Sequence, residues 1–438
     1  MTNSKSEQFK YYDEYTSMSY GLTRISNFLT SIGNPQNQLQ TIHVAGTNGK
    51  GSTAAFIHEI MQAGGYKVAL YTSPHLISFT ERIKINGINI PKKIFTLIAT
   101  TYLTKAKQYK LSYFEYMTAI ALIYFVQQKV DIAIIETGLG GRFDATNIIK
   151  NPMVCVITSI AKDHQKILGT TIKKIAFEKA GIIQSSADLI CGKIPQQVLP
   201  IFSQRAKHKM LVYNFDFKTK SHGYQYNSKL DQYNQKFDFI NNNINIQHLE
   251  TIMLGQHQII NASNAICATS LLNYRGYYIN ETHIRNGIKN TKWNGRFDII
   301  NIKINNSKVK LIIDGAHNLQ GLNSFFNTFK QLNLALEKRT FIFTVMQDKE
   351  YQMMIKLTVP FVKNVILPHI NNTRAIDPNI LKVEFTKYMS KKNVYIVDSV
   401  QTSLNINTNN NEIIVVLGSL YLVGEILSYI HKGILDNN

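Results

Sequence analysis

Short apolar runs alternate with helical patterns in the first half of the chain. In the helical patterns, apolar residues recur near a period of 3.6. The apolar runs are IHVAG, KVALYTS, VDIAIIETG and MVCVITSI, between Thr41 and about Ile194, and the helical patterns cover Phe56 to Ala63, Tyr113 to Lys129 and Ile172 to Ala180. Strands that alternate with helices predict a mostly parallel sheet with helices on both faces.

A second alternating block begins after Trp293. Its apolar runs are KVKLIID, RTFIFTV, NVILPHI, NVYIVD and EIIVVLG. Because 438 residues exceed the size at which one hydrophobic core keeps growing, we expect two α/β domains. These are an N-terminal domain of P-loop type over residues 1–292 and a smaller domain over residues 293–438. The polar stretch from Phe215 to Asn245 predicts a hairpin or surface excursion, and its residues indicate no chemistry.

The stretch TIHVAGTNGKGSTAAF joins the first predicted strand to a helix. In the turn Gly46 to Gly51, glycines let the backbone close on a bulky anion, the helix N-terminus favours negative charge, and Lys50 adds a cation. A triphosphate fits these features. The strict pattern G-x-x-x-x-G-K-[ST] is not met, because Val44 replaces the first glycine and Gly51 separates Lys50 from Ser52. The turn is therefore either a variant phosphate loop or only a glycine turn.

Several polar residues follow the other predicted strands. Gly46, Ser73, Gly138 and Ser159 all come after strand-like runs, which places them along one edge of the sheet, where ligands of such sheets bind. Glu136 ends an all-apolar strand, and a carboxylate there suits Mg²⁺, which prefers oxygen ligands. Taken alone, Ser73 is more often a turn serine, and Glu136 is equally a capping or surface residue.

Further candidates lie downstream. Asp163 and His164 follow another apolar run, although a lone histidine is more often a hydrogen-bonding residue than a ligand. Lys179 ends a helical pattern, where a solvated lysine is the default. In the second block, WNGRFDII supplies Arg296 and LIIDGAHN supplies Asp314. Together these residues describe a phosphate loop, a metal site and polar groups from a second domain that close over a nucleotide.

Composition narrows the classes of protein. The formal charge is +20, but the basic residues are scattered and match no nucleic-acid-binding signature, so we expect anionic small molecules and no nucleic acid. The N-terminus lacks a signal-peptide pattern, and the longest apolar run, Met117 to Val126, has about half of the ~20 residues of a membrane span. Three cysteines without metal-ligand spacing suit a reducing compartment. We expect a cytoplasmic protein without membrane association.

Ten motifs occur in the order expected for one family: HVAGTNGKGS, TSPHL with FTERI, YFE, ETGLGGRFDATN, ITSIAKDH, EKAGI, HQIINA, GRFD, DGAHN and GSLYLVGE. On these motifs, which span His43 to Glu425, the chain resembles folylpolyglutamate synthases, which are often bifunctional as dihydrofolate synthases and are similar to the Mur amino-acid ligases of peptidoglycan synthesis. The resemblance implies ATP-dependent ligation of L-glutamate to a reduced folate, and also to dihydropteroate, through an acyl phosphate.

The resemblance also implies roles for individual residues. Lys50, His164, Lys179 and Arg296 would serve catalysis, and some members carry the lysine matching Lys179 as a carbamate. The implied binding residues are Thr47, Asn48, Gly49, Lys50, Gly51, Ser52, Asn261, Arg296 and Asp314 for ATP, Ser73, Glu136 and His164 for two Mg²⁺ ions, and Tyr113, Phe114, Glu115, Phe143, Asp144 and Ala145 for the pterin.

The chain departs from the family pattern at three positions. Leu319 replaces the usual proline after DGAHN, Asp298 replaces the common glutamate after GRF, and Gln165 replaces a common threonine after AKDH. None of these changes removes a predicted ligand, so we expect an active enzyme, and most relatives act as monomers.

Two rival readings remain. One is another Mur-type ligase with a nucleotide-sugar substrate, against which YFE, GLGGRFDATN and EKAGI favour the folate branch. The other is a catalytically silent nucleotide-binding or nucleic-acid-binding protein, against which the intact Lys50, Ser73, Glu136 and His164 argue.

Overall fold

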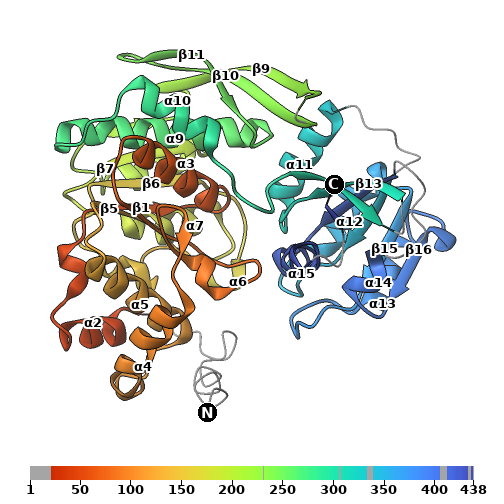
Figure 1. The fold of residues 1–438 in the computed structure, drawn as a ribbon, viewed down its shortest axis with the longest axis horizontal. Coiled ribbons are helices and arrows are strands. Elements are labelled where there is room, and N and C mark those ends of the chain that lie inside the picture. The colour runs from red at the N-terminus through yellow and green to blue at the C-terminus, as the bar shows by residue number, and fades with distance from the viewer. Residues whose placement is uncertain are drawn as a thin grey trace.

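The computed structural model describes residues 21–229, 231–304, 307–332, 339–404, 412–432 and 436–437. It contains two α/β domains, each built on its own large sheet, and a small third sheet beside them (Figure 1). This arrangement confirms the expected fold class. None of the helices within these ranges is long and apolar enough to cross a membrane.

The first sheet has eight strands in the order β4-β3-β2-β5-β1-β6-β7-β8. The six strands from β2 to β8 in this order pair in parallel, and β3 and β4 add an antiparallel edge. The strands are β1 (Thr41–Ala45), β2 (Val68–Tyr71), β3 (Ile83–Ile85), β4 (Ile88–Asn89), β5 (Ile132–Glu136), β6 (Val154–Ser159), β7 (Asp188–Lys193) and β8 (Met210–Val212). The order β2-β5-β1-β6 brings Ser73, Gly138, Gly46 and Ser159 to one edge, as predicted.

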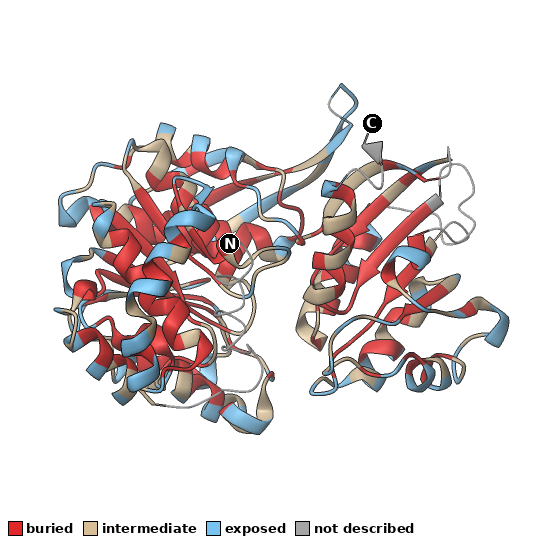
Figure 2. Ribbon diagram, turned by 60° about the horizontal axis from the view of Figure 1, so that its bottom comes forward, coloured by how far each residue is buried: buried red, intermediate tan, exposed pale blue. Residues whose placement is uncertain are grey.

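Helices cover both faces of this sheet, which explains why its central strands are buried along their whole length (Figure 2). One face packs on α3 (Lys50–Ala63), α9 (Gln256–Leu272) and α10 (Glu281–Asn290). The other face packs on α2 (Thr23–Thr30), α4 (Lys92–Gln108), α5 (Tyr113–Gln127), α7 (Ile172–Lys179) and α8 (Leu199–Ser203). A short helix, α6 (Gln165–Leu168), follows β6.

The second large sheet has seven strands in the order β16-β15-β14-β17-β13-β12-β18. Its strands are β12 (Asp298–Ile304), β13 (Ser307–Ile313), β14 (Arg339–Phe343), β15 (Asn364–Pro368), β16 (Val394–Val397), β17 (Glu412–Leu417) and β18 (Asp436–Asn437). One face packs on α11 (Leu319–Gln331), α12 (Tyr351–Thr358) and α13 (Pro378–Phe385), and the other on α14 (Val400–Leu404) and α15 (Leu420–His431). Because this sheet begins at β12, we propose residues 292 and 293 as the domain boundary.

The polar stretch after β8 forms an antiparallel sheet of β9 (Phe217–Asn227), β10 (Gln232–Asn241) and β11 (Asn245–Thr251). This result confirms the predicted hairpin and adds a third strand. Phe237 and Phe239 are buried against the core that contains α9, while the β9–β10 hairpin extends toward the second domain (Figure 1).

Candidate functional site

The turn between β1 and α3 is compact because its glycines lie against other groups. Gly49 has φ +86°, and a Cβ there would lie 2.4 Å from Oδ1 of Asn261 on α9. A Cβ on Gly46 would lie 1.9 Å from Oγ1 of Thr158 on β6. A larger residue at either position would therefore have to displace a side chain of the sheet or of α9. The helix α3 then begins at Lys50, so its N-terminus faces the same turn.

Hydrogen bonds from β6 and α7 hold this turn. Thr158 Oγ1 donates to the Asn48 carbonyl at 2.7 Å, and the Asn48 amide donates to Ser159 Oγ at 2.9 Å. From α7, the Lys179 ammonium donates to the Gly46 carbonyl at 2.7 Å. Lys179 is buried, which contradicts the default reading of a solvated lysine. Its burial, together with the nearby positive charge of Lys50, lowers its pKa to about 7.

Glu136 and Ser73 lie beside Lys50 of the predicted phosphate loop. Lys50 Nζ is 3.8 Å from Glu136 Oε1, and the Ser73 amide donates to Glu136 Oε2 at 3.2 Å. Burial raises the pKa of Glu136 above its usual range, and Lys50 opposes the rise. Arg296 also favours the charged form of Glu136. A buried carboxylate beside cationic groups, with a serine next to it, fits a site for a hard divalent cation.

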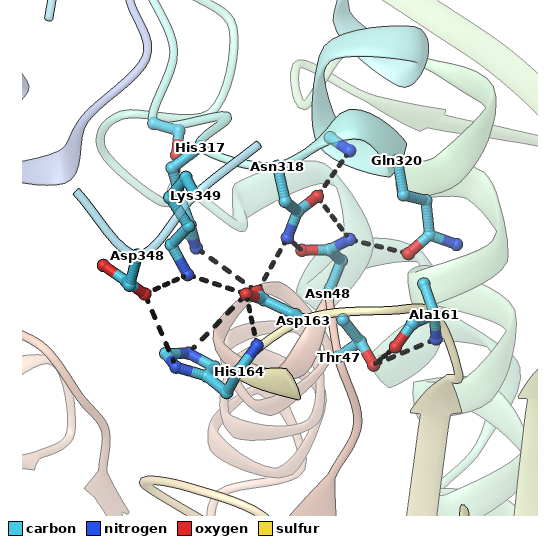
Figure 3. A network of polar contacts seen from close by, with 12 residues as sticks. Thr47, Asn48, Ala161, Asp163, His164, His317, Asn318, Gln320, Asp348 and Lys349 are labelled. Atoms are coloured by element: carbon cyan, nitrogen blue, oxygen red, sulfur yellow. Dashed lines mark hydrogen bonds and ion pairs between the residues drawn. The ribbon is translucent and has the colours of Figure 1, made fainter. Parts of the chain in front are cut away.

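Asp163 binds groups from both domains (Figure 3). Its carboxylate accepts hydrogen bonds from Lys349 Nζ at 2.7 Å and from Asn318 Nδ2 at 2.9 Å, both in the second domain. Although burial opposes ionisation, His164 and Lys349 hold the pKa of Asp163 well below its usual range. Lys349 also lies 3.2 Å from Asp348. The two domains are thus joined through buried charges.

His164 lies in the same cluster with φ +48°. Its Nε2 is 3.9 Å from Asp163 Oδ1, and its Nδ1 is 4.0 Å from Asp348 Oδ2. Burial lowers the pKa of His164 to about 4, although Asp163 opposes this shift. The imidazole is therefore neutral near pH 7 and has a lone pair for a metal ion, which fits the expected ligand role.

The phosphate loop itself contacts the second domain. Asn48 Nδ2 donates to Gln320 Oε1 at 2.6 Å and to Asn318 Oδ1 at 3.2 Å, and Asn318 Nδ2 donates back to Asn48 Oδ1 at 3.0 Å (Figure 3). Asn318 also caps the N-terminus of α11 through the Gly321 amide. A group bound by the loop would therefore meet residues at the start of α11.

Arg296 and Asp314 shape the adjoining edge of the second domain. Arg296 Nη1 donates to the Gly295 carbonyl at 2.9 Å, and a Cβ on Gly315 would lie 2.7 Å from this nitrogen. Asp314 accepts from the Phe297 amide at 2.9 Å, so its carboxylate ties the GRFD segment to DGAHN. Burial raises the pKa of Asp314 to about 6, against the effect of Arg296.

The predicted pterin-side carboxylates form structural hydrogen bonds. Glu115 forms a capping box with Ser112 at the start of α5 and pairs with Arg24 at 3.0 Å. Asp144 caps the short 3₁₀ helix Ala145–Ile148 and accepts from the Leu139 amide at 2.7 Å. Glu115 therefore fixes the start of α5 against α2, and Asp144 fixes the loop that follows β5.

The predicted pterin-side aromatic residues differ in exposure. Phe114 lies over Gly138, where a Cβ would come within 2.5 Å of the ring, and Tyr113 is buried. Phe143 is 46% exposed, and the Arg142 guanidinium lies 4.2 Å from its ring centroid. Phe143 is thus the aromatic surface in this set that a planar ligand reaches without rearrangement.

The sequence reasoning missed Lys349 and Gln320. Lys349 follows β14 by six residues in the segment MQDKE, where adjacent acidic and basic residues after a predicted strand are the available signal. Gln320 lies in the first turn of α11, directly after the DGAHN motif and Leu319.

The two α/β domains match two family models. Residues 44–269 match the Mur ligase middle domain, and residues 297–429 match the dihydrofolate synthetase C-terminal domain. Together with the phosphate loop that contacts a second α/β domain, these matches define the Mur-type class of ligases.

Named relatives narrow the class. The chain is 32% identical over 414 residues to a dihydrofolate synthase/folylpolyglutamate synthase of Bacillus subtilis, covering 93% of this chain and 94% of the relative. It is similar in structure to a folylpolyglutamate synthase of Thermotoga maritima (TM-score 0.82, 32% identity, 99% and 98% of the two chains) and to Escherichia coli FolC in complex with DHPP and ADP (TM-score 0.83, 26% identity, 98% and 97%). The chain belongs to the dihydrofolate synthase/folylpolyglutamate synthase family and is an ATP-dependent ligase.

Proposed function

We propose that the chain joins L-glutamate to a reduced folate and to dihydropteroate, using ATP to activate the acceptor carboxylate. The observation that carries this proposal is the contact of the phosphate-loop residue Asn48 with Asn318 and Gln320 of the second domain. A nucleotide at the loop would sit where the two domains meet. Closure of such a site excludes the water that would otherwise hydrolyse an acyl phosphate.

The reaction begins with positioning of ATP. The α3 N-terminus and Lys50 bind the phosphates, with backbone contacts from Thr47 to Ser52, and Asn261 orients the loop through Gly49. Arg296 brings a positive charge from the second domain. The acceptor carboxylate attacks the γ-phosphorus in line, giving an acyl phosphate and ADP. The glutamate amine then attacks the acyl carbon, and phosphate leaves.

Ser73, Glu136 and His164 would hold Mg²⁺, which supplies neutralisation of the phosphate oxygens when it is bound. The buried carboxylate of Glu136, whose pKa burial raises, and the neutral imidazole of His164 support this assignment. Two metal sites are proposed because Glu136 lies at the end of β5 and His164 lies after β6. Asp314 contributes by fixing the segment that carries Arg296.

Lys179 is proposed to position the phosphate loop through the Gly46 carbonyl. Its amine is also proposed to react with CO₂ and form a carbamate. A pKa of about 7 leaves much of the amine unprotonated at neutral pH, which is the form that attacks CO₂. The nitrogen–carbon bond forms as the amine loses a proton. The product would place a carboxylate beside Lys50.

The pterin is proposed to bind beyond the end of β5. Phe143 supplies an exposed aromatic face, and Tyr113 and Phe114 line the wall behind it. Glu115, Asp144 and Ala145 hold the surrounding loops. The protein is proposed to act as a cytoplasmic monomer on small molecules, without a nucleic-acid partner.

The experiment is ADP formation by the purified chain with ATP, Mg²⁺ and glutamate, comparing dihydropteroate, a reduced folate monoglutamate and no pterin. ADP with both pterins supports the bifunctional proposal, and ADP with the folate alone restricts it to polyglutamate synthesis. ADP that depends on a nucleotide-sugar acceptor, or no ADP at all, would favour the Mur-type or silent alternatives. Lys50→Ala is the negative control, and Lys387→Ala, at an exposed lysine, is the matched one.

A further inference from the structure

Two histidines and an aspartate meet on the small antiparallel sheet, away from the phosphate loop. His222 lies on β9, Asp238 on β10 and His248 on β11, so each strand supplies one side chain. One ligand atom from each residue lies within 4.8 Å of the other two. In the part of the chain that the structure describes, this is the one group of three such residues close enough to hold a metal ion together.

Irregular strand pairing aims these side chains at one another. The register between β9 and β10 shifts between Gln235 and Phe237, next to His222, and the register between β10 and β11 shifts between Phe237 and Phe239, opposite His248. His248 has φ +54°, a conformation that is unfavourable for most residues. Bulges of this kind re-aim side chains, and they are treated as designed features of a sheet.

The aspartate is held between the two histidine residues. Asp238 Oδ1 accepts from His222 Nε2 at 2.8 Å and from the His248 amide at 2.8 Å. Burial works against ionisation, but these hydrogen bonds hold the pKa of Asp238 below its usual range. The two imidazole rings lie 5.2 Å apart with an angle of 37° between them. Both histidines are exposed to solvent, so an ion has access to the group.

We propose that His222, Asp238 and His248 form a binding site for Zn²⁺. Neutral imidazoles and a carboxylate are ligands that Zn²⁺ takes in tetrahedral sites, with a fourth position left for water. Imidazole nitrogen binds Zn²⁺ more readily than Mg²⁺ or Ca²⁺, so two imidazoles in one donor set favour Zn²⁺ over the metal proposed for the ligase reaction. On binding, Nε2 of His222 gives up its hydrogen bond to Asp238 and takes the metal with its lone pair, while the ring proton moves to Nδ1.

The site would cross-link all three strands of a sheet that reaches the second domain. Near the β9–β10 turn, Asn301 Nδ2 donates to Asp231 Oδ2 at 2.6 Å. Tyr233 of the same hairpin has its ring centroid 5.9 Å from Nζ of Lys310, which lies on β13 of the second domain. A bound ion would therefore stiffen a connection between the domains that is separate from the contacts around Asp163.

The test is calorimetric titration of the chelator-treated full-length protein with ZnCl₂ in buffer that contains excess Mg²⁺. The variants are His222→Ala and His248→Ala, with His208→Ala as a matched control at an exposed histidine outside the cluster. His164→Ala identifies any Zn²⁺ bound at the ligase site. Because the replaced histidines are at the surface, the variants are expected to unfold cooperatively without metal, and this cooperative transition verifies that they fold.

The expected result is one equivalent of Zn²⁺ that persists in His208→Ala and His164→Ala. In His222→Ala and His248→Ala, its affinity should fall by more than about 100-fold, beyond the effect of losing an outer-shell partner. Zn²⁺ should also raise the melting temperature of the wild type but not of these two variants. Identical Zn²⁺ isotherms for the wild type and both variants would overturn the proposal and leave a metal-free hydrogen-bonded cluster.

Discussion

Replacing Lys349 by methionine removes the ammonium that pairs with Asp163 across the two domains. The pair is 2.7 Å long, and the side chains of Lys349 and Asp163 are only 6% and 8% exposed. Removing one partner of a buried pair costs roughly 3–5 kcal/mol, because the other charge stays buried. Asp163 keeps hydrogen bonds from Asn318 Nδ2 and from the His164 amide, which reduces the expected loss to about 2–3 kcal/mol.

Because the pair joins the domains, its loss destabilises the proposed closed arrangement, in which both domains contact the nucleotide. It corresponds to a decrease of about 30- to 150-fold in kcat/KM. The lowered pKa of Asp163 means that this carboxylate is ionised at neutral pH. Its charge contributes fully to stability above the usual carboxylate pKa, and the contribution is lost only as the pH falls through the lowered pKa.

The assay is steady-state ADP release with ATP, glutamate and a folate at saturating Mg²⁺. Lys387→Met is the matched control, since Lys387 pairs with Glu384 at 2.6 Å but is 55% exposed, and an exposed pair contributes little. A wild-type kcat/KM for Lys349→Met would refute the reasoning that the two domains act through this ion pair.

Three further predictions follow from the loop, the metal ligands and the buried carboxylates. Gly49→Ala, with φ +86° and a Cβ 2.4 Å from Asn261 Oδ1, should raise the KM for ATP by about 5- to 30-fold, whereas Gly65→Ala, with the same φ and no atom within 4 Å, should leave it unchanged. His164→Ala should raise the Mg²⁺ concentration needed for half-maximal turnover, and an unchanged titration would remove His164 from the metal site. Burial raises the pKa of Asp298 to about 7, so its contribution to stability is complete below the usual carboxylate pKa and is lost as the pH rises through about 7. The free energy of unfolding of Asp298→Asn in urea should lack this decline with pH. Parallel pH profiles of the unfolding free energy for the wild type and the variant would contradict the prediction.

Much of the fold was predictable because the central strands are buried on both faces. Strands with helices above and below become continuous apolar runs, as IAIIE in β5 and EIIVVL in β17 show. The start of α3 was less predictable. The turn was expected to run from Gly46 to Gly51, but the helix already starts at Lys50, because the left-handed Gly49 ends the turn.

The site was predictable where motifs are local and less so where contacts are distant in sequence. The turn from Gly46 to Gly51 shows its chemistry in consecutive residues. The partner of Lys179 is a carbonyl 133 positions away, and burial rather than composition sets its pKa. The grouping of His222, Asp238 and His248 depends on bulged strand register, which no local hydrophobic pattern encodes.

The most direct test of the central claim is to identify the product of the wild-type chain and of Lys50→Ala. Each protein is incubated with ATP, Mg²⁺, L-glutamate and a reduced folate monoglutamate whose carboxylates carry ¹⁸O, and the products are analysed by mass spectrometry. We expect the wild type to form a folate extended by one glutamyl residue and to release phosphate containing ¹⁸O, because the acceptor carboxylate gives one oxygen to the transferred phosphoryl group. Lys50→Ala should form neither product. Wild-type protein that forms no glutamylated folate, or that releases only unlabelled phosphate while doing so, would contradict the acyl-phosphate ligase proposed for this chain.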